Sequence, residues 1–254
     1  RGELVCDEIG IRPTLFAIGR DVDGGGIEAL KRCASAGAEL AAHSYQHDYA
    51  MASRDVPFVF EDVARVAATF TSAFGKAPTG FRAPGYLVSQ VLYDALVALG
   101  FTYDSSVLPS PSYYAVKAVM LTAYKIFGKT SAARYGDPCS TLKRTAPYRE
   151  GPLVELPIAV TTLARLPLTA TALMLAPKPL RLAMLGATSE TVVINAHAMD
   201  FVDAKTDGLS PALATRQPEL RISIEKRLAS FRDSVRRLLE KREALTCTAL
   251  AARA

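Results

Sequence analysis

Residues 14–47 of the chain read TLFAIGRDVDGGGIEALKRCASAGAELAAHSYQH, and this stretch decides the fold. It begins with a short apolar run, residues 14–19, which ends in glycine and predicts a buried strand. Residues 26–36 follow with apolar side chains at helical spacing, and residues 38–42 form a second short apolar run. A strand, a helix and another strand in this order are typical of a parallel sheet with right-handed crossovers.

The alternation of short strands and helices continues along the rest of the chain. Further strands are predicted at residues 80–83, 101–105, 153–158, 191–196 and 245–248. Helices are predicted at residues 1–12, where the chain opens in the last part of a helix, and at 58–74, 89–100, 114–127 and 216–243. The length of 254 residues and this number of strands favour a closed or nearly closed barrel over an open sheet.

The composition excludes several classes of protein. Half of the residues are hydrophobic and 22% are charged, as in ordinary globular domains. The net charge is only +5, and the basic residues of 216–242 alternate with acidic ones, which predicts a solvated helix face and no nucleic-acid binding. The four cysteines form no C-x-x-C pair, as expected for small buried residues in a reducing compartment.

Two features bear on where the protein works. No uninterrupted apolar run of about 18 residues predicts a transmembrane helix. The chain begins without Met, inside a predicted helix, so we expect its natural N-terminus to lie upstream. We favour a cytoplasmic or membrane-associated location.

Polar residues suited to catalysis follow the ends of four predicted strands. They are His43 with His47, Arg82, Asp104, and His197 with Asp200. In (β/α) barrels the carboxyl ends of the strands form the rim on which active sites are built. Four separate segments that converge on one rim are stronger evidence for a site than any single motif.

His43 and His47 are four residues apart. If the segment takes a helical turn, both imidazoles project from one side. Two imidazole nitrogens suit Zn²⁺ at about 2.0–2.1 Å, and a catalytic zinc usually takes three protein ligands and keeps one position for water. Two surface histidines in a loop are the alternative, and the spacing alone leaves both interpretations open.

Five stretches together resemble a known family. TLFAIG at residues 14–19 and HSYQH at 43–47 resemble the polysaccharide deacetylase (NodB-homology) domain. FRAPGY at 81–86, YDSS at 103–106 and INAHAMDF at 194–201 resemble its third, fourth and fifth motifs, in the family's order. The resemblance implies a distorted (β/α) barrel of the deacetylase type. We predict a single domain over residues 1–254, with a divergent insertion at about 107–185.

The resemblance also implies roles for residues around a metal. His43 and His47 become metal ligands, and the metal, most simply zinc, polarises an amide carbonyl and activates water. Arg82 pairs with the family's general-base carboxylate. The turn Pro84, Gly85 and Tyr86 supplies an N–H group to the oxyanion of the tetrahedral intermediate.

His197 is implied to be the general acid that gives a proton to the leaving amine. Asp104 is the first candidate for the carboxylate that holds His197 in its cationic form, and Asp200 is the second. Each residue also has a structural interpretation: a buried ion pair for Arg82, a loop or turn cap for Asp104 and Asp200, and a core histidine for His197.

One family motif is missing. The family's first motif, T-F-D-D, supplies the general base and the third metal ligand, and nothing in this sequence matches it. Asp7 and Glu8 lie within the opening helix, and Asp21 and Asp23 follow the wrong strand. We expect the chain to start after the missing strand; the alternative is a divergent member that has lost the motif and the activity.

The predicted function is metal-dependent hydrolysis of an N-acetyl or other N-acyl group on an amino sugar or polysaccharide. One alternative is deformylation or deacetylation of a lipid-linked amino sugar at a membrane surface. Residues 163–185 are apolar with Lys178 and Arg181 beside them, which suits that substrate, although we prefer an insertion packed on the barrel. The other alternative is a non-catalytic glycan-binding module.

Overall fold

The computed structural model describes residues 2–128, 131, 134–135 and 138–254. The chain forms two compact units. Residues 12–157 and 245–254 make one, which we call the sheet unit, and residues 1–11 and 158–244 make the other, which we call the helical unit. The prediction of a single domain with an insertion at 107–185 stays a prediction.

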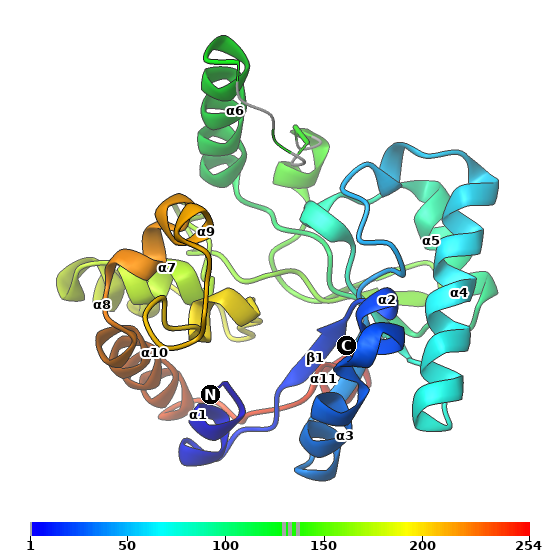
Figure 1. The fold of residues 1–254 in the computed structure, drawn as a ribbon, viewed down its shortest axis with the longest axis horizontal. Helices are drawn as coiled ribbons and strands as arrows, with labels where there is room; N and C mark the ends of the chain where they lie inside the picture. The colour runs from blue at the N-terminus through cyan, green and yellow to red at the C-terminus, as the bar shows by residue number, and fades with distance from the viewer. Residues whose placement is uncertain (1, 129–130, 132–133, 136–137) are drawn as a thin grey trace. The chain divides into compact units, whose positions relative to one another are not determined.

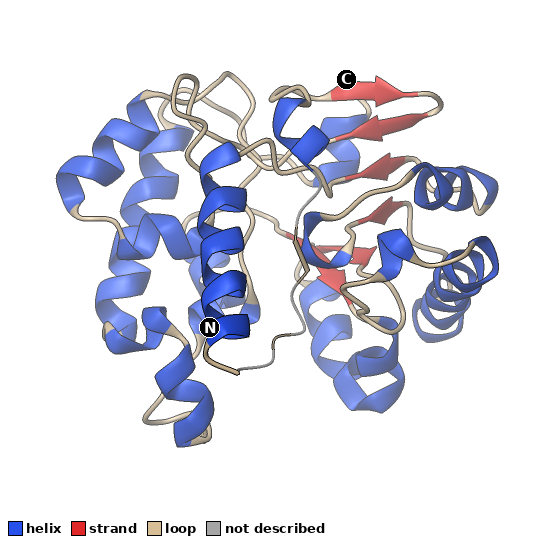
Figure 2. Cartoon of the chain, turned by 90° about the horizontal axis from the view of Figure 1, so that it is seen from above, coloured by secondary structure: helices blue, strands red, loops and turns tan. Residues whose placement is uncertain are grey.

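Six strands form one sheet in the sheet unit, in the order β1-β2-β3-β4-β6-β5 (Figures 1 and 2). The strands are β1 Thr14–Ala17, β2 Glu39–Ala42, β3 Gly80–Phe81, β4 Tyr103–Asp104, β5 Tyr148–Glu150 and β6 Leu153–Glu155. The pairs β1–β2, β2–β3, β3–β4 and β4–β6 are parallel, and β5 joins β6 as an antiparallel edge strand. The predicted α/β class with a parallel sheet is confirmed, and only the β5 edge was absent from the prediction.

Helices connect these strands, and local capping explains where they begin and end. They are α2 Gly19–Asp21, α3 Ile27–Ser35, α4 Val56–Phe74, α5 Gln90–Ala98, α6 Pro111–Ile126 and α11 Cys247–Ala251. The Asp55 carboxylate accepts from Phe58 N at the start of α4, and Gly75 ends it with a left-handed φ of 74°. The Ser89 hydroxyl accepts from Leu92 N at the start of α5.

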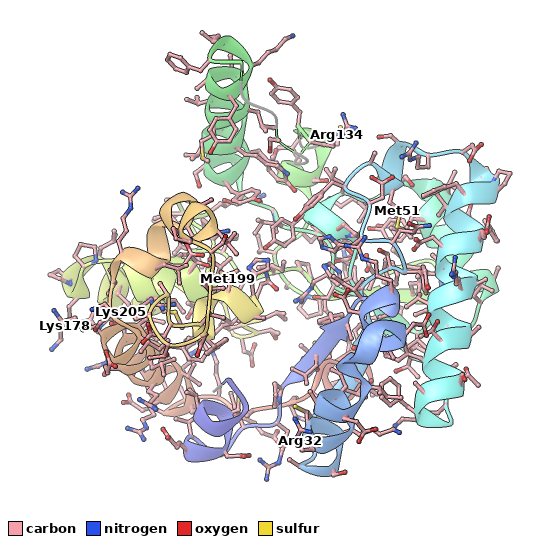
Figure 3. All side chains as sticks on the ribbon, in the orientation of Figure 1. Arg32, Met51, Arg134, Lys178, Met199 and Lys205 are labelled. Carbon is pink, nitrogen blue, oxygen red and sulfur yellow. The ribbon has the colours of Figure 1, made fainter. Side chains whose placement is uncertain are left out.

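The core of the sheet unit lies between α4, α5 and the strands. The apolar side chains of α4, which recur at helical spacing, are buried, with Val59, Val63, Val66 and Phe70 each no more than 1% exposed. Met51, labelled in Figure 3, is buried in the same core. This packing fixes the ends of β2, β3 and β4, from which the site residues emerge.

The helical unit has its own apolar core. Its helices are α1 Gly2–Glu8, α7 Ala170–Leu175, α8 Lys178–Gly186, α9 Pro211–Arg216 and α10 Ile224–Leu239. Leu173, Met174, Met184 and Leu185 are buried there. The apolar segment 163–185 therefore supplies core residues of the helical unit, and its packing on a barrel stays a prediction.

Two predicted strands are wrong. Residues 191–196 are extended but form no strand, because Val193 and Asn195 bond through their carbonyls to different segments, at Ala159 N and Ala170 N, and no continuous ladder develops. The predicted strand 245–248 is instead the start of α11, where the Thr246 hydroxyl accepts from Ala249 N.

The predicted helix 216–243 is too long. Its first part is a separate 3₁₀ turn, Pro218–Arg221, and α10 begins only at Ile224. Proline has no amide hydrogen to donate, so it starts a helical segment instead of continuing one. None of the helices in the described part of the chain is long and apolar enough to cross a membrane.

Candidate active site

His43 and His47 follow β2, and their rings meet edge to face. Their Nε2 atoms are 3.1 Å apart and their ring centroids 4.7 Å apart. Nδ1 of His43 lies 2.7 Å from the Arg82 carbonyl oxygen. Because a carbonyl oxygen only accepts, Nδ1 carries the proton and Nε2 presents its lone pair toward His47. Metal-binding histidines are fixed in the same way, through a hydrogen bond from the other ring nitrogen.

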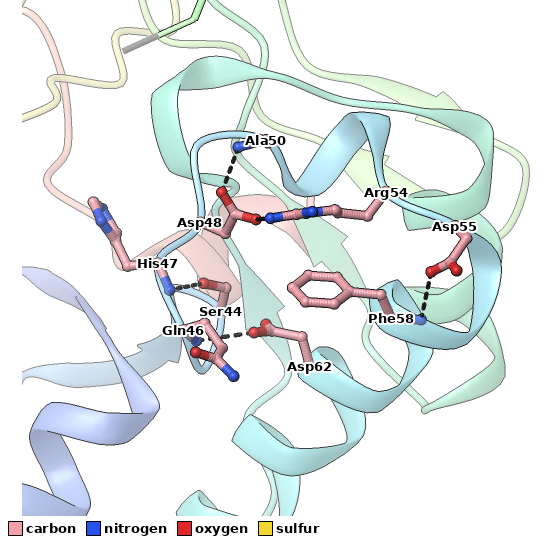
Figure 4. Close-up of polar contacts among 9 residues, drawn as sticks. All are labelled: Ser44, Gln46, His47, Asp48, Ala50, Arg54, Asp55, Phe58 and Asp62. Carbon is pink, nitrogen blue, oxygen red and sulfur yellow. Dashed lines mark hydrogen bonds and ion pairs between the residues drawn. The ribbon is translucent and has the colours of Figure 1, made fainter. Parts of the chain in front are cut away.

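The loop that carries both histidines is no helical turn. Ser44 and His47 have φ values of 57° and 56°, in the left-handed region that side chains rarely adopt. The His47 N–H donates to the Ser44 hydroxyl at 2.8 Å (Figure 4). A left-handed conformation at a non-glycine residue costs of the order of 1–3 kcal/mol of free energy. It is retained only where surrounding contacts impose it. The strained loop, and not helical spacing, brings the imidazoles together.

Asp62 on α4 imposes this loop conformation. Its Oδ1 accepts from Tyr45 N at 2.8 Å. Its Oδ2 accepts from Gln46 N at 2.9 Å (Figure 4). The side chain is 4% exposed, and this burial raises the pKa of the Asp62 carboxyl against the effect of the two N–H donors. Asp62 is therefore a positioning residue for the histidine loop.

Arg82 lies directly behind His43. Its Nε donates to the Ser105 carbonyl at 2.8 Å and its Nη2 to the Ser105 hydroxyl at 2.7 Å. Its guanidinium carbon lies 4.0 Å from the centroid of the Phe16 ring. The side chain is buried, and these contacts tie the ends of β1, β3 and β4 together. Its pairing with a general-base carboxylate stays a prediction.

The turn Pro84–Tyr86 follows β3. Gly85 and Tyr86 have φ values of 69° and 63°, so two successive residues are left-handed. A Cβ atom on Gly85 would lie 2.8 Å from Cδ1 of Tyr49, so only glycine fits without a shift of that ring. The sharp turn is the kind of backbone that can present N–H groups to an anion, and that role stays a prediction.

Asp104 ends β4 and is fully buried. Its Oδ1 accepts from the Ser106 hydroxyl at 2.6 Å, and the Ser106 oxygen accepts from Ala83 N at 2.7 Å. Burial raises the pKa of Asp104 to about 6, although the hydrogen bonds and the Arg82 charge act in the opposite direction. Asp104 thus contacts its own loop through Oδ1, and its catalytic role stays a prediction.

His197 and Asp200 lie in the helical unit, around the 3₁₀ turn Ala198–Phe201. Asp200 Oδ2 accepts from the backbone N of His197 at 2.8 Å, and its Oδ1 accepts from the Thr171 hydroxyl at 2.6 Å. Arg227 donates to the Asp200 carbonyl at 2.7 Å. Asp200 therefore fixes the backbone of the His197 turn. The acid role of His197, and Asp104 as its partner, stay predictions.

The donor set fits part of a zinc site. His43 and His47 offer two converging nitrogens, but no three His, Cys, Asp or Glu side chains converge within the described ranges. Asp48, next to His47, is committed elsewhere: it accepts from Ala50 N and from Arg54 Nε, each at 2.8 Å (Figure 4). These residues therefore account for two ligands of a metal and leave the third to be identified.

Sequence reasoning missed two residues of this region, although both had a signal. Asp62 is a carboxylate beside Val59, Val63 and Val66 on the apolar stripe of a helix. Glu155 is a carboxylate in the middle of an apolar strand, LVELPI. A charged residue at a core position is rarely buried without a specific partner, which makes each a candidate for a structural or functional role.

The chain is similar to known proteins over part of its sequence. Residues 5–103 match the family model described as polysaccharide deacetylase. The peptidoglycan deacetylase of Helicobacter pylori is 34% identical over 83 residues, which are 32% of this chain. The match spans 27% of that relative's length. The matched family region includes the histidine loop, Arg82 and the Pro84–Tyr86 turn, and ends before Asp104 and His197.

Solved structures share the fold over almost the whole chain. A candidate polysaccharide deacetylase from Mycobacterium smegmatis superposes with a TM-score of 0.59 at 17% identity, over 99% of this chain and 74% of that one. A family 4 carbohydrate esterase from Streptomyces lividans gives 0.51 at 14% identity, over 94% and 80%. The predicted distorted (β/α) barrel fold is confirmed. Residues 5–103 of the chain are therefore similar to the polysaccharide deacetylase family.

Proposed function

We propose that this protein hydrolyses the N-acetyl group of an amino sugar in a glycan, with a divalent metal, zinc, as cofactor. One observation carries the proposal: the Nε2 atoms of His43 and His47 face each other at 3.1 Å while Nδ1 of His43 is fixed by a backbone carbonyl. The family match and the peptidoglycan deacetylase of Helicobacter pylori support an amino-sugar polymer as the substrate.

The residues of the sheet unit have distinct tasks in this reaction. A bound zinc ion, held by His43 and His47, supplies Lewis acidity toward an amide carbonyl and a water molecule. The Arg82 carbonyl keeps His43 in the tautomer that ligates through Nε2. The left-handed turn at Gly85 and Tyr86 offers backbone N–H groups to the oxygen that becomes negatively charged.

His197 in the helical unit is the proposed general acid, which protonates the leaving amine as the carbon–nitrogen bond breaks. Its backbone is fixed by the Asp200 carboxylate at 2.8 Å.

Zinc binding and acetate release test the proposal. Zinc titrated into the 254-residue chain by calorimetry is expected to bind one-to-one and to lose that binding in His43→Ala and in His47→Ala. His197→Ala is the matched control, because the chain has only three histidines, and it should keep zinc while it loses release of acetate from N-acetylated glycan fragments. Equal zinc binding by His43→Ala and the unchanged chain contradicts the proposed site.

One observation favours a second candidate, a non-catalytic glycan-binding module. The described residues supply two metal ligands and no converging third. A module of this kind retains glycan fragments on a column without releasing acetate at any zinc concentration. In α7 and α8, Leu173, Met184 and Leu185 are buried in the core of the helical unit and offer no surface to a lipid-linked substrate.

A further inference from the structure

Two buried carboxyl groups lie side by side at the end of the sheet. Asp104 on β4 and Glu155 on β6 are directly paired in the parallel register, so their side chains point to the same face. Both residues are 0% exposed. A pair of like charges in this position is disfavoured, because both carboxyl groups are buried away from water and repel each other.

Of the four carboxyl oxygens of this pair, one lacks a hydrogen-bond donor among the described residues. Glu155 Oε1 accepts from Val107 N at 2.9 Å and Oε2 from the Tyr93 hydroxyl at 3.4 Å. Asp104 Oδ1 accepts from Ser106 at 2.6 Å. Asp104 Oδ2 is buried, and no donor reaches it from the described residues if both carboxyl groups are ionised. A proton on Glu155 supplies that donor.

The surrounding groups favour one proton on the pair. Tyr93 on α5 and Tyr148 on β5 are held neutral, since burial raises the pKa of both phenols. Glu150 on β5 adds a negative charge, which is bonded to Lys143 at 3.1 Å. Arg82, from the end of β3, is the cation on the side of Asp104. Burial, and then the Asp104 charge, raise the pKa of Glu155 well above its usual value.

A chain of hydrogen bonds leads from this pair to the metal ligand. Asp104 holds Ser106, whose oxygen accepts from Ala83 N. Ser105 donates to Leu156 O at 2.8 Å, next to Glu155, and accepts from Arg82. The carbonyl of Arg82 in turn accepts from His43 Nδ1. The loops after β3 and β4 therefore take their position from the β4–β6 junction.

We propose that Asp104 and Glu155 share one proton, which Glu155 donates to Asp104 Oδ2, and that Glu155 is thereby a positioning residue for His43. The proton sharing stands independently of the proposed function. The consequence for a metal ligand rests on that function.

The pH dependence of unfolding tests the shared proton. Above an ordinary glutamate pKa of about 4.3, the native state holds one proton that the unfolded state has lost. The stabilisation that the shared proton contributes is therefore fully present at low pH. It falls as the pH rises toward the raised pKa of the native state, and the unfolding constant changes by up to about tenfold per pH unit.

Urea unfolding from pH 5 to 8 is measured for the unchanged chain, Glu155→Gln and the exposed control Glu28→Gln. The glutamine amide donates to Asp104 Oδ2 at every pH. In Glu155→Gln, the slope of the unfolding free energy against pH should therefore become shallower by up to the contribution of one proton, whereas Glu28→Gln should keep the slope of the unchanged chain. An unchanged slope in Glu155→Gln overturns the shared proton.

Histidine nitrogen spectra test the positioning. His43 should show the Nδ1–H tautomer in the unchanged chain and in Glu155→Gln, and a shifted, mixed tautomer in Glu155→Ala. If Glu155→Ala folds and leaves the His43 spectrum unaltered, the positioning role is overturned. If Glu155→Ala does not fold, the double variant Asp104→Asn with Glu155→Gln takes its place, and an unaltered His43 spectrum there overturns the role. The urea and histidine measurements need no zinc. Failure of the zinc titration would therefore count against the proposed function and not against the shared proton.

Discussion

Replacing Asp62 by alanine tests how the histidine loop is held. The substitution removes the acceptor of two backbone N–H groups, those of Tyr45 and Gln46. Tyr45 is 8% exposed, so water cannot replace the lost acceptor, whereas Gln46 is exposed and can be rehydrated. The two hydrogen bonds are therefore unequal in their contribution.

The magnitude follows from these burials. An orphaned buried N–H costs about 1–3 kcal/mol, and a lost bond that water replaces about 0.5–1.5 kcal/mol. Burial of the Asp62 carboxylate is itself unfavourable, as its raised pKa indicates. Its removal therefore offsets part of the lost stability. We expect Asp62→Ala to lower the free energy of unfolding by about 2–3 kcal/mol. We also expect Ser44 and His47 to leave the left-handed region, which separates the two imidazoles.

Urea denaturation measures the change in stability, and hydrogen exchange at Tyr45 N–H measures the local opening. Glu61→Ala is the matched control, because residue 61 is exposed and adjacent on α4. Asp62→Asn keeps the shape and one acceptor, so its effect should be intermediate. If Asp62→Ala lies within about 0.5 kcal/mol of Glu61→Ala, the reasoning about these hydrogen bonds is wrong.

Two further substitutions probe the two units separately. Gly80→Ala places a Cβ atom 1.8 Å from Cζ of the buried Tyr103 ring, so we expect a loss of about 3 kcal/mol or failure to fold, whereas Gly24→Ala, with no atom within 4 Å, should fold normally in the same thermal melt. Arg227→Met removes donors from three backbone carbonyls in the helical unit and should cost about 3 kcal/mol in urea. The exposed Arg236→Met is its control, and equal midpoints contradict the prediction.

The site was predictable from the sequence where a residue follows a strand end. Short apolar runs ending at His43, Arg82 and Asp104 predicted strands, and parallel strands direct their carboxyl ends to one side. The geometry between them was not predictable. The left-handed conformation of Ser44 depends on the Asp62 carboxylate, which comes from a different element.

Local sequence determined the helices and strands whose signals are complete within a few residues. The cap at Ser89, the stop at Gly75 and the apolar stripe of α4 are of this kind, because each depends on side chains one or two turns away. The motifs around His43 and Arg82 also carried the resemblance to the polysaccharide deacetylase family, whose model matches residues 5–103.

Only the tertiary structure decided which distant groups meet. Residues 191–196 look like a strand, yet their carbonyls bond to two different segments and no ladder forms. Asp104 and Glu155 look like unrelated carboxylates, yet the β4–β6 register places them together in the core. Strand pairing and the burial of charge depend on contacts between remote segments, so no window of the sequence contains them.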